Sequence, residues 1–245
     1  MENITTFNLE LLSKFDKIFV LVSGGIDSTY LYQIIKQKYP SKVYPVNCFN
    51  PYEFSTTLDL ISKEENFISI KPHKTINYKQ ILISAFLNLP KSRIMKKYSK
   101  KVFGCCRQIK HNAFNKEKMF KEENTVVIDG IKYSDGMQRR LWLKSLYDGK
   151  ERSRGAIIIN APTFFHKMKN GMLKCYPFRD YKENRNLPEN IIDELKMIYP
   201  NLTHSGCKIC PVLVRFEKKI RKNNDKFDLE RLEISIEFAK RLNVY

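Results

Sequence analysis

Apolar residues along this chain fall into short β-branched runs, separated by stretches in which apolar residues recur at helical spacing. Five such runs predict buried strands, at residues 17–22, 42–49, 66–72, 125–130 and 156–160. Between the first two runs, residues 28–38 place Leu31, Ile34 and Ile35 on one face of a predicted helix. Strands that alternate with helices favour an α/β fold, a parallel five-stranded twisted sheet with helices on both faces.

The two ends of the chain also predict helices. Residues 5–16 indicate a short helix, and residues 228–243 indicate an amphipathic helix that packs on the body through Leu229, Leu232, Ile236 and Leu242. We therefore expect an α/β domain over residues 1–165 and a smaller, helical, cysteine-containing region over residues 166–245.

The charge balance changes this picture by pointing to a partner. The chain has 245 residues, with 44 Lys and Arg against 26 Asp and Glu, and a formal net charge of +18. A merely lysine-rich composition is one interpretation, and a polyanionic partner such as nucleic acid is the sharper one. A membrane-surface protein is less favoured, because no long basic amphipathic helix stands alone.

Two features favour a cytoplasmic location. No apolar run approaches the length needed to cross a bilayer, and the first ten residues lack the charged start and apolar block of a signal peptide. In a reducing compartment the six cysteines are expected to bind metal or catalyse rather than form disulfides.

A glycine turn joins the first predicted strand to the first predicted helix, in the string Ser-Gly-Gly-Ile-Asp-Ser at residues 23–28. A strand that ends in such a turn leaves backbone N–H groups pointing outward at the positive end of the helix dipole, where they can hold phosphate. Gly24 and Gly25 allow close approach, Ser23 and Ser28 add hydroxyl donors, and Asp27 can orient the loop or hold Mg²⁺. A tight turn with a helix cap is the structural alternative.

This string resembles the S-G-G-x-D-S loop of the PP-loop ATP pyrophosphatases, the adenine nucleotide α-hydrolase superfamily. The resemblance implies a Rossmann-like fold in which the loop grips the pyrophosphate of Mg²⁺-bound ATP. It also implies that residues 1–165 form the nucleotide-binding domain and that AMP is transferred to an oxygen of the acceptor. Positioning and charge neutralisation would supply most of the catalysis.

Four of the six cysteines form two tight pairs, Cys105 with Cys106 and Cys207 with Cys210. Adjacent thiolates fit one tetrahedral zinc ion poorly, but they can bind different irons of a larger cluster. A 4Fe–4S cluster is therefore favoured, with zinc or unliganded cysteines as alternatives. Cys48 and Cys175 stand alone and are expected to be core residues.

The paired cysteines narrow the resemblance to the phosphoadenosine-phosphosulfate reductase branch of the superfamily, over residues 17–212. Their pattern resembles the cluster ligands of iron–sulfur sulfonucleotide reductases and of related DNA-sulfur-modification enzymes. Residues 129–140 resemble the T-G-x-R-x-x-E-S-x-x-R segment, with Gly130, Lys132, Asp135 and Arg139 at its glycine, first arginine, acidic and last arginine positions. Residues 166–245 would then complete the cluster site and form a helical cap.

Two departures separate this chain from the reductases. Their phosphate loop is degraded, whereas this one is intact, and they use a cysteine in a C-terminal tail, whereas no cysteine follows Cys210 here. We therefore expect an AMP- and pyrophosphate-forming enzyme that thiolates a nucleic acid, with tRNA favoured over DNA as the target. The alternatives are an assimilatory sulfonucleotide reductase and a non-catalytic, metal-stabilised nucleic-acid-binding protein.

The expected site combines three sets of residues. Ser23, Asp27 and Arg139 are the expected catalytic residues. ATP is expected to contact Ser23, Gly24, Gly25, Ile26, Asp27, Ser28, Gly130 and Lys132, and the cluster is expected on Cys105, Cys106, Cys207 and Cys210. The expected cofactors are ATP, Mg²⁺ and the 4Fe–4S cluster. The expected protein partners are a sulfur donor, such as a cysteine desulfurase, and a second copy of the chain. No membrane is expected as a partner.

Overall fold

The computed structural model of the chain describes most of its length, and the following account is of those residues: 1–54, 56–72, 76–95, 101, 104–132, 143, 156–158, 164–179, 181, 187–202 and 205–245. They form two compact units, each assembled from three segments. The first comprises Met1–Asn47, Ser55–Ile68 and Glu117–Thr203, and the second comprises Cys48–Phe54, Ser69–Lys116 and His204–Tyr245. The expected boundary at residue 165 falls inside the first unit.

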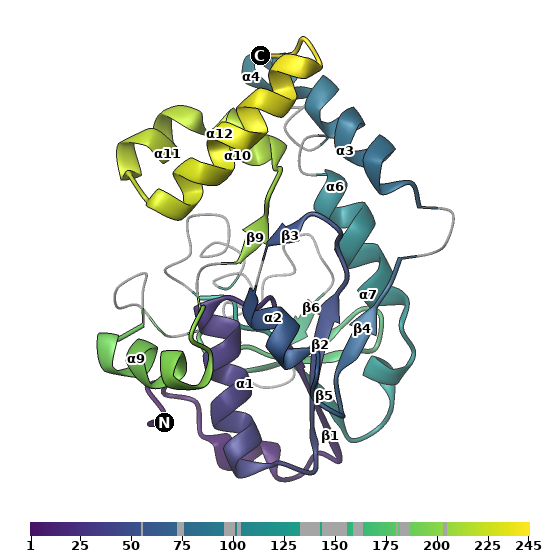
Figure 1. The fold of residues 1–245 in the computed structure, drawn as a ribbon. Coiled ribbons are helices and arrows are strands. Elements are labelled where there is room, and N and C mark those ends of the chain that lie inside the picture. Colours follow the sequence, from purple (N-terminus) through teal and green to yellow (C-terminus); the bar gives the residue numbers. More distant parts are fainter. Residues whose placement is uncertain are drawn as a thin grey trace. The chain divides into compact units, whose positions relative to one another are not determined.

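The fold is α/β, built on a mostly parallel sheet flanked by helices (Figure 1). Within the described residues this sheet has seven strands, in the order β4-β2-β1-β5-β8-β7-β6. The pairs β1–β2, β1–β5 and β5–β8 are parallel, and β8–β7 and β7–β6 are antiparallel. The strand bounds are β1 (Lys17–Leu21), β2 (Val43–Cys48), β4 (Ile68–Ile70), β5 (Thr125–Ile128), β6 (Ala156–Ile158), β7 (Phe165–Met168) and β8 (Leu173–Cys175).

The sheet corrects one expectation of the sequence. All five predicted strands form, but the sheet is mixed rather than wholly parallel, and β6 lies at an antiparallel edge. The place beside β5 is taken by β8, which the apolar pattern did not indicate. Strands β7 and β8 form a hairpin whose turn contains Gly171 at φ +90°, a conformation that glycine adopts readily.

Both faces of β1 are buried, as expected for a central strand. Ile18 and Val20 belong to the core that includes α1 (Ile26–Lys38) and α9 (Glu189–Ile198), which contact each other (Figure 1). Phe19 packs edge-on against Phe120 of η3 (Met119–Lys121), with ring centroids 4.9 Å apart. Two short elements complete the first unit: α2 (Thr56–Ile61) and η1 (Leu9–Leu12).

The N-terminal helix predicted over residues 5–16 is wrong: only the single 3₁₀ turn η1 forms there. Asn8 accepts a hydrogen bond from the backbone of Glu10 and starts this turn. The turn ends after four residues, and Phe7, Leu12 and Phe15 all enter the same core.

The second unit is mainly helical. Its helices are α3 (Tyr78–Leu87), α4 (Leu89–Ile94), α6 (Gly104–Cys106), the π-helical turn η2 (Arg107–His111), α7 (Asn112–Lys116), α10 (Pro211–Arg215), α11 (Glu217–Asn223) and α12 (Lys226–Arg241). The predicted C-terminal helix is confirmed as α12, and its Leu232 and Ile236 are buried against Leu82, Phe86 and Leu213. A two-stranded antiparallel ribbon, β3 (Glu53–Phe54) with β9 (Gly206–Cys207), completes the unit.

Candidate functional site: a nucleotide loop and a cysteine pocket

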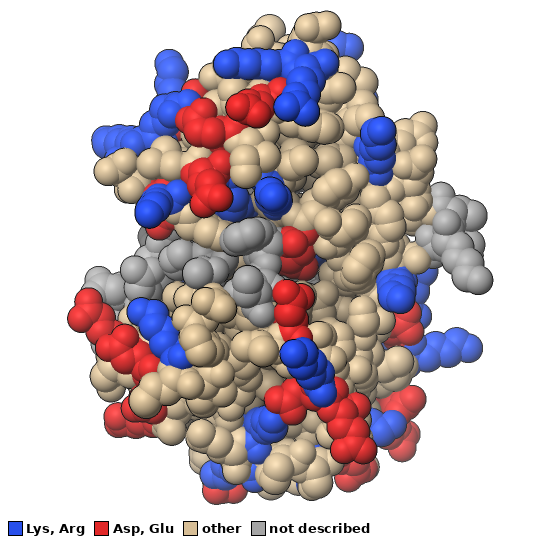
Figure 2. Space-filling view, in the orientation of Figure 1, with Lys and Arg blue, Asp and Glu red and all other residues tan. Residues whose placement is uncertain are grey.

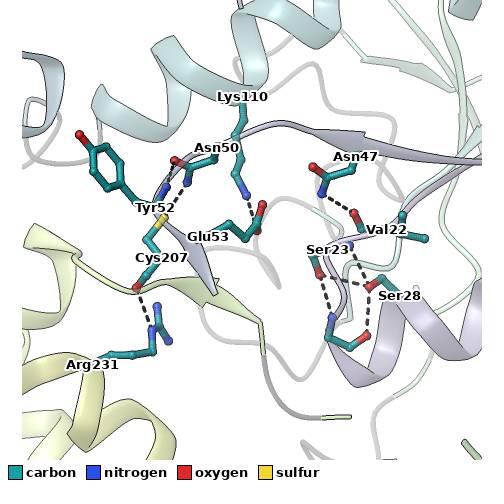
Figure 3. Close-up of polar contacts among 11 residues, drawn as sticks. Val22, Ser23, Ser28, Asn47, Asn50, Tyr52, Glu53, Lys110, Cys207 and Arg231 are labelled. Carbon is teal, nitrogen blue, oxygen red and sulfur yellow. Dashed lines mark hydrogen bonds and ion pairs between the residues drawn. The ribbon is translucent and has the colours of Figure 1, made fainter. Parts of the chain in front are cut away.

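The glycine turn lies where the sequence predicted it, between the end of β1 and the start of α1. Gly24 has φ +74°, a conformation that disfavours residues with a side chain. The Ser28 hydroxyl stabilises the loop from within: it accepts from the Ser23 N–H and donates to the Gly25 carbonyl, both at 3.1 Å (Figure 3). Gly25 is the helix N-cap and offers no side-chain cap, so the first turn of α1 begins without a side-chain acceptor.

Lys132 is brought to this loop from the segment that follows β5. Its Nζ lies 2.7 Å from Asp27 Oδ1, and its side chain is only 2% exposed. Asp27 is 32% exposed. A buried ammonium paired with a partly open carboxylate forms an ion pair beside the loop, in which the carboxylate satisfies the buried charge. Lys132 and Asp27 are 105 residues apart, so only the tertiary fold could pair them.

Gly130 marks how close that segment comes to α1. A methyl group on its Cα would lie 3.4 Å from Leu31 Cδ1 and 3.7 Å from Ser28 Cα, both ordinary van der Waals contacts. The chain leaving β5 therefore passes directly along the first turn of α1. Just before it, the half-buried Asp129 pairs with Lys174 of β8 at 3.0 Å, a contact that sequence reasoning missed.

Asn47 has a structural role beside the loop. The sequence left open whether Asn47 and Asn50 contact a nucleotide. The Asn47 amide is buried and donates to the Val22 carbonyl at 2.8 Å, which secures the end of β1 where the loop begins (Figure 3). Asn50 belongs to the second unit and binds a cysteine there.

The four paired cysteines line one small pocket of the second unit, although the two pairs are separated by 100 residues. Three elements supply them: α6 carries Cys105 and Cys106, β9 carries Cys207, and Cys210 is the N-cap of α10. The rest of the lining comes from Asn50, Tyr52, Leu82, Ile109, Ile209 and Pro211. The structure therefore brings together the cysteines that the sequence singled out.

Polar contacts hold the CxxC side of this pocket in place. Asn50 Nδ2 donates to Cys207 Sγ at 3.0 Å, and Arg231 Nε donates to the Cys207 carbonyl at 2.9 Å (Figure 3). The Cys210 N–H donates to the hydroxyl of the fully buried Ser235, also at 2.9 Å. Arg231 and Ser235 lie four residues apart on α12, so this helix positions both cysteines.

The electrostatics of the pocket distinguish the four thiols. The Cys105 thiol donates a hydrogen bond to Cys106, which lowers the pKa of Cys106 to about 7, against the effect of burial and with help from the Lys110 charge. The same hydrogen bond, with burial, raises the pKa of Cys105 well above its usual value. Burial raises the pKa of Cys207, and it raises that of Cys210 to about 12. Neutral thiols of this kind release protons when a metal binds.

Lys110 is held in place by Glu53. Its Nζ lies 2.6 Å from Glu53 Oε1, and the Glu53 side chain is only 6% exposed (Figure 3). Glu53 belongs to no motif that the sequence singled out. The pairing of β3 with β9 sets it opposite Cys207, in the same pocket.

The donor set fits the expected cofactor. Four thiols around one pocket are ligands that a 4Fe–4S cluster or a zinc ion uses. Across the described residues, no three His, Cys, Asp or Glu side chains are grouped as for a single metal ion. The four thiols thus line one pocket without the close grouping of a single-ion site among the described residues.

Two residues that the sequence predicted, Arg139 and Asp135, lie outside the described part of the chain. Of the two lone cysteines, Cys175 is fully buried in the first unit's core, as expected, and Cys48 is half-buried. Among the described residues, no helix has the length and apolar composition needed to cross a bilayer.

Comparison with known proteins adds no assignment to this geometry. No family model matches the chain, and no curated protein matches it significantly.

Proposed function

We propose that this protein is an ATP-dependent, AMP- and pyrophosphate-forming sulfurtransferase that thiolates a nucleic acid, tRNA before DNA. The observation that carries the proposal is the Ser23–Ser28 loop at the carboxyl end of a central parallel strand, with the buried Lys132 paired to Asp27. Ligands of α/β sheets commonly bind at this edge, and anions bind at helix N-termini.

Each loop residue has a role in this proposal. The backbone N–H groups from Gly24 to Asp27 and the Ser23 hydroxyl would bind the pyrophosphate part of ATP. Lys132 would neutralise phosphate charge, and the partly exposed Asp27 carboxylate would hold Mg²⁺. Arg139 stays a predicted catalytic residue, assigned from the sequence alone.

The chemistry would proceed in two balanced steps. The acceptor oxygen attacks the α-phosphorus of ATP, so that an acceptor–AMP bond forms and pyrophosphate leaves. Hydrosulfide, released from the cysteine persulfide of a desulfurase by a thiol reductant that is oxidised to its disulfide, would then attack the acceptor carbon. The carbon–sulfur bond forms, the carbon–oxygen bond breaks, and AMP leaves with that oxygen. Both steps depend on positioning and on neutralising the charge of the transferred group.

The cysteine pocket supports sulfur chemistry because its donors fit an iron–sulfur cluster. Cys105, Cys106, Cys207 and Cys210 would hold the cluster, and a bound cluster would supply a metal site for sulfur. In visible absorbance spectra, anaerobically purified protein is expected to show the broad brown band of iron–sulfur proteins. A colourless protein with one bound zinc per chain would contradict this assignment.

The proposed activity is tested by following radiolabelled ATP with anaerobically reconstituted protein, a sulfur donor and bulk tRNA. AMP and pyrophosphate are expected in equal amounts, together with thiolated RNA. The Ser23→Ala and Asp27→Asn variants are expected to lose activity by about 100-fold, the scale for removing one preorganised electrostatic contact. Lys63→Ala, an exposed charge of the same unit that is outside the loop, is the control and should leave the activity unchanged.

Two other outcomes would replace the proposal. Sulfite release from an adenylylated sulfate with a thiol reductant would assign the sulfonucleotide reductase activity instead. Nucleic-acid binding without AMP formation from any acceptor would assign a non-catalytic, metal-stabilised binding protein.

A further inference from the structure

The positive charge of the chain is concentrated in the second unit. Both units contain 22 Lys and Arg residues, but the second unit contains 7 Asp and Glu where the first contains 19. The first unit is thus close to neutral, at +3, and the second carries +15 of the net charge of +18. A uniformly lysine-rich composition, one interpretation of the sequence, does not explain this difference.

Within the second unit, the excess lies on one segment. Ser69–Lys116 contains 12 Lys and Arg and no Asp or Glu. The C-terminal helices differ, because their charges are interspersed and paired. Arg221 contacts both Glu217 and Glu233, and Arg231 contacts Asp228. Figure 2 shows blue and red side chains close together over α11 and α12.

Several basic residues of the acid-free segment are open to a ligand. Lys71, Lys79, Arg107 and Lys116 are exposed, and within the described residues none of them forms an ion pair. One ion pair of this segment, between Lys110 and Glu53, belongs to the cysteine pocket. Exposed cations without carboxylate partners are available to neutralise the phosphates of a nucleic acid.

An aromatic pair, Phe49 with Tyr78, is joined through the backbone to two of these cations, Lys71 and Lys79. The Phe49 side chain is 40% exposed, and its ring centroid lies 6.1 Å from that of Tyr78, edge to face. The Phe49 N–H donates to the Ile70 carbonyl at 2.8 Å, which places Phe49 beside the residue that precedes Lys71. Tyr78 is the first residue of α3 and is followed directly by Lys79.

The start of α3 is fixed by a cap, which gives the aromatic pair a defined geometry. Asn77 Oδ1 accepts from the Gln80 N–H at 3.0 Å and so sets the first turn in which Tyr78 and Lys79 lie. A large exposed aromatic ring costs solvation in water. A ring held in place and flanked by exposed lysines is instead suited to stack on a base whose phosphates the lysines contact.

We propose that Phe49 and Tyr78, with Lys71 and Lys79, form a binding surface for unpaired nucleotides, such as those of an RNA loop. In a duplex the faces of the bases are covered by their neighbours, so a stacking surface of this kind selects single strands. This inference rests on the proposed function in one respect only: it takes the bound nucleic acid to be the acceptor of the proposed sulfur transfer. Binding itself requires no ATP.

Fluorescence anisotropy tests this surface with the full-length protein and a labelled oligouridine, compared with a duplex RNA of the same length. The oligouridine is expected to bind more tightly than the duplex, with an affinity that falls steeply as salt rises. Phe49→Ala is expected to weaken its binding about tenfold, within the range for loss of one base–aromatic stack, without changing the salt dependence. Phe49→Trp retains a stacking ring and is expected to restore the affinity.

The lysines give a separate signature. Lys71→Ala and Lys79→Ala are each expected to reduce the slope of log K against log salt by about 0.7, the contribution of one phosphate contact on a single strand. Lys63→Ala, an exposed lysine of the first unit, is the matched control and should leave the slope unchanged. Thermal unfolding of every variant shows whether its fold is intact.

Three results would overturn the inference. These are equal affinities for duplex and oligouridine, equal affinities of the Phe49→Ala and Phe49→Trp variants, and a slope of log K against log salt that neither Lys71→Ala nor Lys79→Ala changes. The test is independent of the proposed chemistry, because Asp27→Asn should bind the oligouridine normally. If the protein forms AMP but does not bind the oligouridine, only this surface is rejected. If it binds the oligouridine but forms no AMP, only the proposed function is rejected.

Discussion

Gly24 is the residue whose backbone sets the shape of the Ser23–Ser28 loop. Its φ of +74° lies in the left-handed region, whereas Gly25 has φ −85° and ψ 161°, an extended conformation open to any residue. The two adjacent glycines therefore have different reasons to be glycine. Gly24 is required by the turn itself, and Gly25 leaves room for a ligand to approach the backbone.

Substituting each glycine by alanine separates these two roles. Gly24→Ala is expected to reduce the free energy of unfolding by about 1 kcal/mol, because an L-residue is strained at that φ. Gly25→Ala is expected to stay within about 0.5 kcal/mol of the original, since the lower entropy of the unfolded chain offsets small losses. Urea unfolding followed by circular dichroism measures both. Equal losses at the two positions would show that φ does not decide the difference.

At the scale of elements, helix α12 organises the cysteine pocket through Arg231. Its guanidinium binds the Cys207 carbonyl of β9 and the Asp228 carboxylate of its own helix. Gly206, next to Cys207, leaves the space that the guanidinium fills. A methyl group on Gly206 would lie only 2.3 Å from Arg231 Nη2 and 2.6 Å from its Cζ.

Gly206→Ala is therefore expected to displace Arg231 and to reduce the free energy of unfolding by about 1.5–3 kcal/mol, the scale of a hydrogen bond to a charged group. Gly104→Ala is the matched control: its methyl group would meet Gln108 Nε2 at an ordinary 3.8 Å, in a helix that favours alanine. Adding Gly206→Ala to Arg231→Met should cost little more than Arg231→Met alone. Additive losses in urea unfolding would contradict this coupling.

At the scale of the whole molecule, each unit depends on segments that are distant in the sequence. The core of the second unit combines Leu82, Phe86 and Leu89 with residues of the C-terminal segment, which are Leu213, Val214, Leu232, Ile236 and Ala239. The core of the first unit, by contrast, is built from residues before 203. Removing the C-terminal segment should thus affect the two units differently.

A chain ending at residue 203 is expected to retain ATP binding but to lose the fold of the second unit. Without the C-terminal segment the apolar faces of α3 and α4 are exposed, so trypsin should cut rapidly within residues 69–116, where lysines and arginines are frequent. Limited proteolysis with mass spectrometry locates the cuts. Deleting only Tyr245, which is half exposed, is the control and should leave the segment resistant. Equal resistance of both chains would contradict this dependence.

Local pattern was sufficient for much of the fold. The runs at 17–22 and 125–130 became neighbouring central strands, because continuous β-branched residues are stable only when both faces of a strand are buried. The spacing of apolar residues over 228–243 predicted α12 for a similar reason. The short strands β7 and β8 were not predicted, because segments of three or four residues that include a lysine are too short to show a periodic apolar pattern.

The sequence by itself determined the chemistry-bearing residues: the glycine loop at 23–28 and the two cysteine pairs. Each of these motifs spans only a few consecutive residues, so it can be recognised from the sequence without knowledge of the fold. Only the tertiary structure decided which residues meet, including Lys132 with Asp27, Asn50 with Cys207, and Arg231 with the Cys207 carbonyl. Such contacts join residues at least 24 positions apart, and they depend on how strands pair and helices pack, which local pattern does not specify.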